Sequence, residues 1–232
     1  MFERQPFDRG AILFDPQRVR APVAALFEPD TLRTRGTHSE EPGGRGSILY
    51  FDCDGAHWVL RRYLRGGMAA RVIHDRYLWL GEERTRSFQE LRLLAELRRR
   101  NLPVPVPVAA RYLRDLLSYR AELITERLPG VQSLSAMLAE QRMDEARWSS
   151  VGRCLRRFHD VGVQHADLNA DNIMLGEPGM VWVLDFDRGR LREPGAWRER
   201  VLDRLARSIA KRRPGATDWQ AGFMLLRTAH DA

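Results

Sequence analysis

Short runs of alternating hydrophobic and polar residues mark the first half of the chain as rich in strands. Two such runs, Ser47 to Phe51 and His57 to Tyr63, flank Asp54 and Gly55. An Asp-Gly pair between two β-rich runs favours a tight turn. We therefore predict an antiparallel hairpin here, and a further strand from Tyr119 to Thr125.

Between these predicted strands, the spacing of apolar residues changes to that of a helix over Ser87 to Arg100. Ser87 and Glu90 stand three positions apart, as in a capping box, in which the two side chains satisfy backbone groups at the helix start. Proline then occupies every second position of Leu102 to Val108. Since proline cannot continue a helix, we expect extended chain at a sheet edge there.

The second half of the chain has a different pattern. Asp144 precedes a segment with apolar residues at helical spacing, which should end at Gly162. Two short apolar runs, Ile173 to Leu175 and Val181 to Leu184, predict a second hairpin. The residues after Asp185 look helical. We predict an α+β protein with a β-rich first half and a helical second half.

Composition and charge point to a folded protein with an anionic partner. The chain has 232 residues, of which 44% are hydrophobic and 30% charged, and carries a net charge of +7. A basic excess favours nucleic acid, a phosphorylated small molecule or an anionic membrane. After Asp185 there are eleven basic and six acidic residues, and Lys211 is the only lysine of the whole sequence.

The cysteines and the apolar stretches suggest a cytoplasmic protein. Cys53 and Cys154 are far apart and show no metal-binding spacing, so neither a disulfide scaffold nor a CxxC metal site is expected. No apolar run reaches the roughly 18 residues of a transmembrane helix. The first residues lack the pattern of a signal peptide.

The residues that suggest chemistry lie between His165 and Asp185. Carboxylates next to apolar runs are costly unless a cation is near. Asp167, Asn172 and Asp185 supply only oxygen atoms as ligands, and oxygen ligands are those that Mg²⁺ prefers. Mg²⁺ usually completes its shell with water and substrate phosphates. The pattern therefore suggests phosphoryl transfer.

The segment His165-Ala-Asp167-Leu-Asn-Ala-Asp-Asn172, followed by Asp185-Phe-Asp, resembles the catalytic loop and D-F-G motif of protein-kinase-like phosphotransferases. The resemblance implies that Asp167 orients the attacking hydroxyl and accepts its proton. Asn172 and Asp185 would hold Mg²⁺ on the phosphates of ATP, and His165 would support the loop. Asp187 stands where the motif has glycine, and no A-P-E triplet follows, so a eukaryotic-type protein kinase is not expected.

The same resemblance assigns nucleotide-binding residues upstream. Gly44 and Gly46 lie where a glycine-rich turn would cover the phosphates, although the full motif is absent. Arg61 takes the place of the usual lysine, with Arg62 as the alternative. Glu90 takes the place of the helix glutamate that pairs with that lysine, while the capping box offers a purely structural explanation.

From about Gly36 to Arg213 the chain is similar to the bacterial 3-deoxy-D-manno-octulosonic acid (Kdo) kinases. This similarity implies a protein-kinase-like two-lobed fold, with a small β-rich N-lobe over residues 1–127 and a reduced helical C-lobe over residues 128–232. It further implies ATP-dependent phosphorylation of the 4-OH of Kdo on Kdo-lipid A, in lipopolysaccharide core biosynthesis. The enzyme is then expected as a peripheral protein at the cytoplasmic face of the bacterial inner membrane.

The basic charge agrees with such a substrate, because Kdo carries a carboxylate and lipid A carries phosphates. Arginines from Arg65 to Arg76 and in the C-terminal region would bind the substrate and the anionic membrane surface. Two alternatives stay open: a heptose or aminoglycoside type kinase, or a basic pseudokinase that only binds. No nucleic-acid-binding motif is recognisable, so no nucleic acid partner is expected.

Overall fold

The computed structural model describes residues 1–19, 23–28, 32, 39–41, 48–53, 55–64, 76–213 and 215–232. These residues form two units. The first comprises Met1–Ala95 and Val106–Arg127, and the second comprises Glu96–Pro105 and Leu128–Ala232. The segment 96–105 therefore groups with the second unit, although it precedes residue 127 in the chain.

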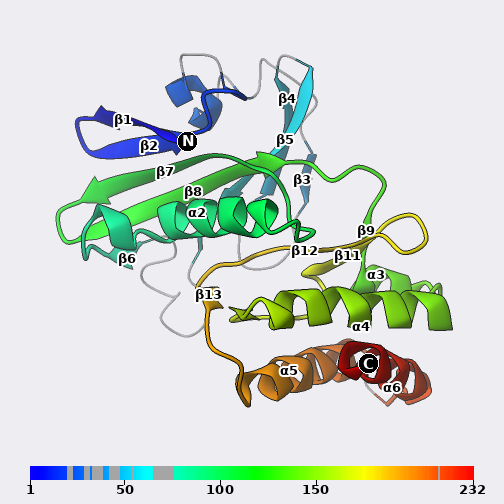
Figure 1. The fold of residues 1–232 in the computed structure, drawn as a ribbon. Coiled ribbons are helices and arrows are strands. Elements are labelled where there is room, and N and C mark those ends of the chain that lie inside the picture. The colour runs from blue at the N-terminus through cyan, green and yellow to red at the C-terminus, as the bar shows by residue number, and fades with distance from the viewer. Residues whose placement is uncertain are drawn as a thin grey trace. The chain divides into compact units, whose positions relative to one another are not determined.

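The first unit is built on an antiparallel sheet, which has eight strands in the described part of the chain (Figure 1). The strand order is β1-β2-β7-β8-β5-β4-β3, and β6 pairs with β8. The strands are β1 (Glu3–Phe7), β2 (Gly10–Phe14), β3 (Ser39–Glu41), β4 (Ile48–Cys53), β5 (Ala56–Arg62), β6 (Tyr77–Leu78), β7 (Pro107–Asp115) and β8 (Ser118–Glu126).

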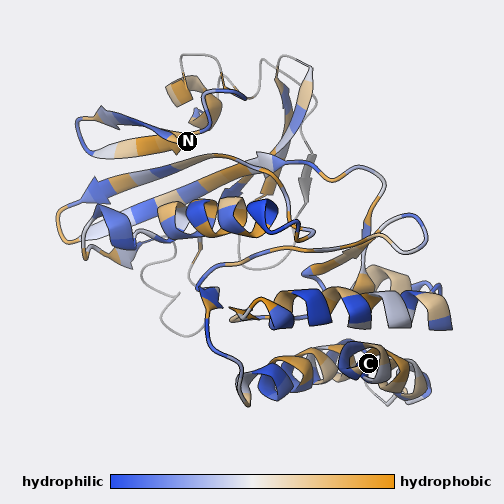
Figure 2. Cartoon of the chain, viewed as in Figure 1, coloured by the Kyte–Doolittle hydropathy of each residue, from blue (hydrophilic) through white to orange (hydrophobic). Residues whose placement is uncertain are grey.

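The hairpin expected around Gly55 is confirmed as β4 and β5, and the strand expected from Tyr119 to Thr125 is confirmed within β8. Gly55 has a φ of 80°, which glycine adopts without the steric cost of a Cβ. The hairpin of β1 and β2 has no counterpart among the strands predicted from the sequence. Figure 2 shows that β1 is mostly hydrophilic and β2 mostly hydrophobic, in keeping with an exposed edge strand beside a buried one.

The prediction of a sheet edge at the proline-rich segment is wrong. Residues 102–106 form no strand, and β7 begins at Pro107 and lies between β2 and β8. A proline is tolerated in a central strand when it is the first residue, where the missing N–H interrupts no ladder of hydrogen bonds. The alternating prolines therefore mark the approach to an interior strand.

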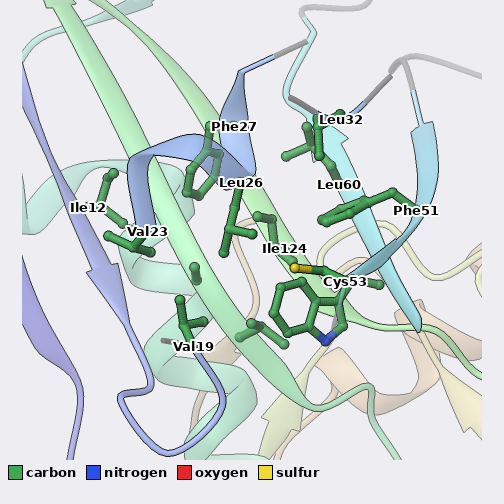
Figure 3. Close-up of a cluster of buried hydrophobic side chains, with 13 residues drawn as sticks. Ile12, Val19, Val23, Leu26, Phe27, Leu32, Phe51, Cys53, Leu60 and Ile124 are labelled. Atoms are coloured by element: carbon green, nitrogen blue, oxygen red, sulfur yellow. The ribbon is translucent and has the colours of Figure 1, made fainter. Parts of the chain in front are cut away.

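The sheet is covered on both faces. Helix α2 (Arg86–Arg99) places Phe88 edge-on against Tyr112 of β7, with ring centroids 5.4 Å apart. The neighbouring Arg111 points to the other face, where its guanidinium donates to the carbonyl oxygen of Phe27 in the short helix η1 (Val23–Phe27). On that face η1 joins a cluster of buried apolar side chains that includes Ile12, Phe27, Phe51, Leu60 and Ile124 (Figure 3).

The second unit contains four helices and five short strands among its described residues. The strands form two small sheets, β12-β11-β9 and β10-β13. The elements are β9 (Gln132–Ser133), α3 (Leu134–Ala139), α4 (Glu145–Asp160), β10 (Val163–Gln164), β11 (Ile173–Leu175), β12 (Val181–Val183), β13 (Arg190–Leu191), α5 (Trp197–Arg212) and α6 (Asp218–Asp231).

The local signals of this unit are confirmed. Asp144 caps α4 by accepting a hydrogen bond of 2.7 Å from the backbone N–H of Arg147. Gly162, with a φ of 79°, follows the C-terminal end of α4. The second hairpin forms from β11 and β12, and the basic C-terminal segment folds into α5 and α6.

Helices α4 and α6 approach each other closely at two glycines. A Cβ on Gly222 would lie 2.0 Å from the indole nitrogen of Trp148, and a Cβ on Gly152 would lie 2.1 Å from the carbonyl oxygen of Leu226. Both cysteines are free and buried, and burial raises the pKa of the Cys154 thiol to about 12. None of the described helices has the length and apolar content that crossing a bilayer requires.

Candidate active site

The loop that carries Asp167 runs from β10 to β11 and is held by its own polar side chains. The backbone carbonyl of Asp167 accepts hydrogen bonds from the amide nitrogens of Asn169, at 3.0 Å, and of Asn172, at 3.1 Å. The backbone N–H of Asp171 donates to the side-chain oxygen of Asn169 at 2.9 Å. Polar residues of this sequence thus close a tight turn, as Asn and Asp do when they bond their local backbone.

His165 connects this loop to the segment that carries Asp185. Its Nδ1 accepts from the backbone N–H of Asp167 at 3.2 Å, and its Nε2 lies 2.8 Å from the carbonyl oxygen of Leu184. Because Nδ1 accepts, the proton must reside on Nε2, which donates to Leu184. The backbone N–H of Leu184 in turn donates to the carbonyl of Asn172 at 2.8 Å. His165 therefore supports the loop, as expected from the sequence.

Asp185 has a left-handed backbone, with a φ of 61°. Such a conformation is uncommon for a residue other than glycine and persists only where the surroundings enforce it. Leu184 is bonded through both its N–H and its carbonyl, and Phe186 is buried against Phe158, with ring centroids 5.6 Å apart. These anchors on both sides hold Asp185 in its strained conformation.

The hydrogen bond from Leu184 places the backbone of Asn172 beside the residue that precedes Asp185, and these are the two predicted metal ligands. The amide nitrogen of Asn172 is used by Asp167, so its amide oxygen stays available as a ligand. Among the described residues, no three His, Cys, Asp or Glu side chains are grouped so that they could hold a metal ion. One amide and one carboxylate fit Mg²⁺, which binds few protein groups when phosphates and water supply the rest.

The carboxylate of Asp167 forms an ion pair with Arg204 of α5, with 2.7 Å between Oδ1 and Nη1. The side chains are 47% and 49% exposed, so both charges remain largely solvated. Two further contacts tie the loop to α5: Ser208 Oγ accepts from the backbone N–H of Ala170 at 3.1 Å, and Arg212 pairs with Asp171.

Sequence reasoning missed these α5 residues. The one available signal was the helical spacing of its arginines, which does not reveal what they contact.

In the first unit, Arg61 pairs with Glu90 as the sequence predicts. The distance from Arg61 Nη2 to Glu90 Oε2 is 2.5 Å, and Tyr63 donates its hydroxyl to the same oxygen at 2.6 Å. The Glu90 side chain is only 2% exposed. Arg62 instead contacts Glu122 at 3.1 Å. The pairing of Glu90 therefore selects Arg61 over Arg62 as the counterpart of the usual lysine.

The capping-box interpretation of Ser87 and Glu90 is wrong. Helix α2 begins at Arg86, so Ser87 lies inside the helix, and its hydroxyl donates to the carbonyl of Arg111 at 3.0 Å. The carboxylate of Glu90 accepts from Arg61 and Tyr63. Tertiary partners thus outcompete the local backbone groups of the helix start.

Gly44 and Gly46, predicted to cover the phosphates, lie outside the described residues, as do residues 65–75 of the arginine-rich segment. Arg76, at the end of that segment, pairs with Asp115.

A pocket of about 410 Å³ opens in the second unit beside the Asp167 loop. Its walls come from the start of that loop and from one face of α5. The lining residues are Gln164, His165, Ala166, Arg200, Val201, Asp203, Arg204 and Arg207. The ion pair of Arg204 with Asp167 links the pocket to the catalytic loop. This arrangement could hold a hydroxyl-bearing ligand next to a carboxylate.

Comparison with known proteins identifies the family. Residues 30–224 match the family model described as "Lipopolysaccharide kinase (Kdo/WaaP) family". The chain is 48% identical over 227 residues to a 3-deoxy-D-manno-octulosonic acid kinase of Stenotrophomonas maltophilia (strain K279a), covering 96% of this chain and 90% of the relative. It is 53% identical over 205 residues to the enzyme of the same name from Xanthomonas axonopodis pv. citri (strain 306), covering 88% and 82%.

Solved structures support the fold. The structure described as "WaaP in complex with acyl carrier protein" aligns with a TM-score of 0.54 at 17% identity, over 90% of this chain and 87% of that one. A structure of WbdD aligns with a TM-score of 0.51 at 18% identity, over 84% and 44%. The predicted α+β, protein-kinase-like fold class is confirmed. The protein is a phosphotransferase that acts on an alcohol group. The chain belongs to the lipopolysaccharide kinase (Kdo/WaaP) family.

Proposed function

We propose that the protein transfers the γ-phosphoryl group of ATP to the 4-OH of Kdo on Kdo-lipid A. The observation that carries this proposal is the joining of Asp167, Asn172 and Asp185 through His165 and Leu184. The choice of acceptor is supported by the relatives at about half identity, which are named Kdo kinases.

Asp167 is proposed to accept the proton of the attacking hydroxyl. The hydroxyl oxygen forms a bond to the γ-phosphorus, the bond from that phosphorus to the bridging oxygen of ADP breaks, and the hydroxyl proton moves to Asp167. A positioned base of this kind contributes about 10²- to 10⁴-fold to the rate. Arg204, 2.7 Å from Asp167, would orient its carboxylate before the acceptor binds.

Asn172 and Asp185 would hold Mg²⁺. When bound, this ion neutralises charge on the phosphates of ATP. Asp185 is suited to the role because its backbone is fixed by Leu184 on one side and by the buried Phe186 on the other. A ligand whose backbone is already fixed loses little freedom when it binds.

Arg61 is proposed to contact the phosphates of ATP while Glu90 and Tyr63 hold it in place. Its guanidinium is planar and can donate two parallel hydrogen bonds to phosphate oxygens, which lysine cannot do. Arg61→Lys should therefore restore only part of the affinity for ATP that Arg61→Ala loses. Loss of activity in Arg62→Ala with full activity in Arg61→Ala would reverse the assignment.

The proposal is tested with purified protein, Mg²⁺, γ-labelled ATP and Kdo-lipid A. We expect label to enter the Kdo residue, and the position of the phosphate can be read by NMR of the product. Heptose and aminoglycoside acceptors run in parallel test for another small-substrate kinase. Transfer to one of these but not to Kdo-lipid A would refute the proposed acceptor, and ATP binding without any transfer would indicate a pseudokinase.

We also propose that the protein works at the cytoplasmic face of the inner membrane as a peripheral protein. The basic excess after Asp185 supports this location, because each basic residue near an anionic bilayer contributes about 1 kcal/mol of attraction. Co-sedimentation with anionic vesicles should fall steeply as salt rises.

Reversing the charges of the exposed Arg190 and Lys211 should weaken vesicle binding relative to the wild-type protein at the same salt concentration. We select these two residues because Arg212 and Arg213 pair with Asp171 and Asp218 within the protein, so reversing those charges would disturb the fold. Vesicle binding that does not depend on the salt concentration, or the absence of vesicle binding, would contradict the proposed location.

A further inference from the structure

The pocket beside the Asp167 loop is lined by three arginines on one face of α5. Arg200, Arg204 and Arg207 follow one another at spacings of four and three residues, so their side chains are neighbours on the helix surface. Arg204 reaches Asp167. Within the part of the chain that the structure describes, neither Arg200 nor Arg207 forms an ion pair.

The charge of this pocket is not balanced by its own walls. Asp203 is the one acidic lining residue, and its carboxylate lies 3.7 Å from Arg227 of α6. Elsewhere, exposed arginines commonly pair with a carboxylate, as Arg92 does with Glu83 and Arg99 with Glu96. Arg204 is neutralised by Asp167, whereas Arg200 and Arg207 have no carboxylate partner among the described residues. Their two guanidinium groups attract an anion into the pocket.

We propose that this pocket binds the acceptor sugar and that Arg200, Arg204 and Arg207 recognise a carboxylate on that sugar. The inference rests on the proposed function, since it names the part of the acceptor that the pocket binds. A pocket of about 410 Å³ suits a single sugar, as small-ligand sites begin at about 300 Å³. Guanidinium groups bind carboxylates through paired, charge-assisted hydrogen bonds.

The position of Arg204 favours an anion on the sugar that is phosphorylated. Its Nη1 is 2.7 Å from Asp167, the proposed base for the acceptor hydroxyl. An oxyanion that contacts the same guanidinium therefore lies near the acceptor hydroxyl. A carboxylate on the phosphorylated sugar meets this condition, and the test below separates it from a phosphate on a neighbouring sugar.

The test combines changes in the protein with changes in the acceptor. Steady-state rates are measured for Arg200→Gln/Arg207→Gln with Kdo-lipid A, with its Kdo carboxamide derivative, and with a derivative that lacks the lipid A phosphates. We expect the KM for Kdo-lipid A to rise about ten- to a hundredfold, as the loss of charged hydrogen bonds predicts. The KM for the carboxamide should already be high in the wild-type protein and should hardly change in the variant. The KM for ATP should be the same in both.

A matched control removes the same charge elsewhere. Arg98→Gln/Arg153→Gln changes two exposed arginines on α2 and α4 that do not line the pocket. This variant should keep the wild-type KM for every acceptor. It separates the loss of a specific contact from a general loss of attraction for an anionic lipid.

The outcomes distinguish this inference from the proposed function. If wild-type protein phosphorylates none of the acceptors, the proposed function itself fails. Suppose that wild-type protein phosphorylates Kdo-lipid A, but that Arg200→Gln/Arg207→Gln raises the KM equally for the acid and the carboxamide, or for neither. This result would overturn the carboxylate site alone. A loss that disappears when the lipid A phosphates are removed would likewise overturn it and assign the arginines to a phosphate.

Discussion

Two pairs of guanidinium and carboxylate groups, one in each unit, differ sharply in their surroundings. Arg61 and Glu90 are 21% and 2% exposed, and Tyr63 adds a hydrogen bond to Glu90. Arg204 and Asp167 are 49% and 47% exposed. Charges attract each other strongly in a medium of low polarity and weakly in water, so the first pair is fixed while the second can exchange partners at low cost.

The difference matches the proposed tasks. A group that positions phosphates has to be in place before ATP arrives, and the burial of Glu90 keeps Arg61 in one orientation. A base for a hydroxyl has to be reachable by the acceptor, and a solvated pair can open for it. We infer that loss of the buried pair lowers stability as well as affinity for ATP, whereas loss of the exposed pair mainly lowers the rate.

The largest expected effect is on rate and comes from Asp167→Asn. The turnover number for Kdo-lipid A should fall about 10²- to 10⁴-fold, because the base is lost. The free energy of unfolding should change by less than about 1 kcal/mol, since the removed charge is solvated. Asp185→Asn is the comparison: it should weaken ATP binding in addition, measured by calorimetry. Wild-type rates in both variants would contradict the assignment of the site.

The next effect is on stability and comes from Arg61→Met, which leaves the carboxylate of Glu90 buried without its cation. We expect the free energy of unfolding, measured in urea without ligands, to fall by about 3 kcal/mol or more. Arg62→Met is the matched control on the same strand. It should lower the free energy of unfolding by less than about 1 kcal/mol, because Glu122 retains its ion pair with Arg111, at 2.6 Å. Equal losses in the two variants would remove the distinction between buried and exposed pairs.

At acid pH, the two ion pairs can be compared only when the effect of His159 on the free energy of unfolding is known. Burial, together with the charges of His230 and Arg198, lowers the pKa of His159 from 6.5 to about 3. Between pH 6.5 and about 3 the unfolded chain therefore binds a proton that the folded protein does not. The free energy of unfolding should fall by up to about 1.4 kcal/mol per pH unit as the pH decreases through this range.

Denaturation at several pH values measures this slope. His159→Gln should reduce it. The effect of pH on the two ion pairs is then best measured in the His159→Gln background. An unchanged slope in that variant would assign the acid sensitivity to other groups.

The smallest expected effect is the coupling energy between Asp167 and Arg204. A double-mutant cycle with Asp167→Asn and Arg204→Gln should give less than about 1 kcal/mol, and added salt should reduce it further. The corresponding cycle for Arg61 and Glu90 should give a larger value that salt hardly changes. A strong, salt-independent coupling for the exposed pair would show that it is not exchangeable.

The sequence predicts the parts of this molecule that depend on local signals. The turn at Gly55 and the cap at Asp144 are each specified by one or two residues. The pair of Arg61 and Glu90 follows from a different kind of evidence, which is the order of these residues relative to the catalytic loop. That order predicts the contact because members of a family share their fold.

Features that depend on tertiary contacts could not be predicted. Nothing near Arg204 or Ser208 in the sequence indicates that they contact the Asp167 loop. Ser87 and Glu90 look like a local cap, and only the neighbouring strands reveal their real partners. The alternating prolines before Pro107 describe the backbone of that segment, but they contain no information about which strands lie beside β7.

Arginine at position 61 also determines which reagents can modify this protein. Acylating probes label the nucleotide-binding lysine of kinases because an amine can lose its proton and become a nucleophile. A guanidinium stays protonated at all working pH values and does not react. Lys211 on α5 is the only lysine side chain of the sequence. An amine-directed dye should therefore attach to α5, and to a free α-amino group where one is present, leaving Arg61 unmodified.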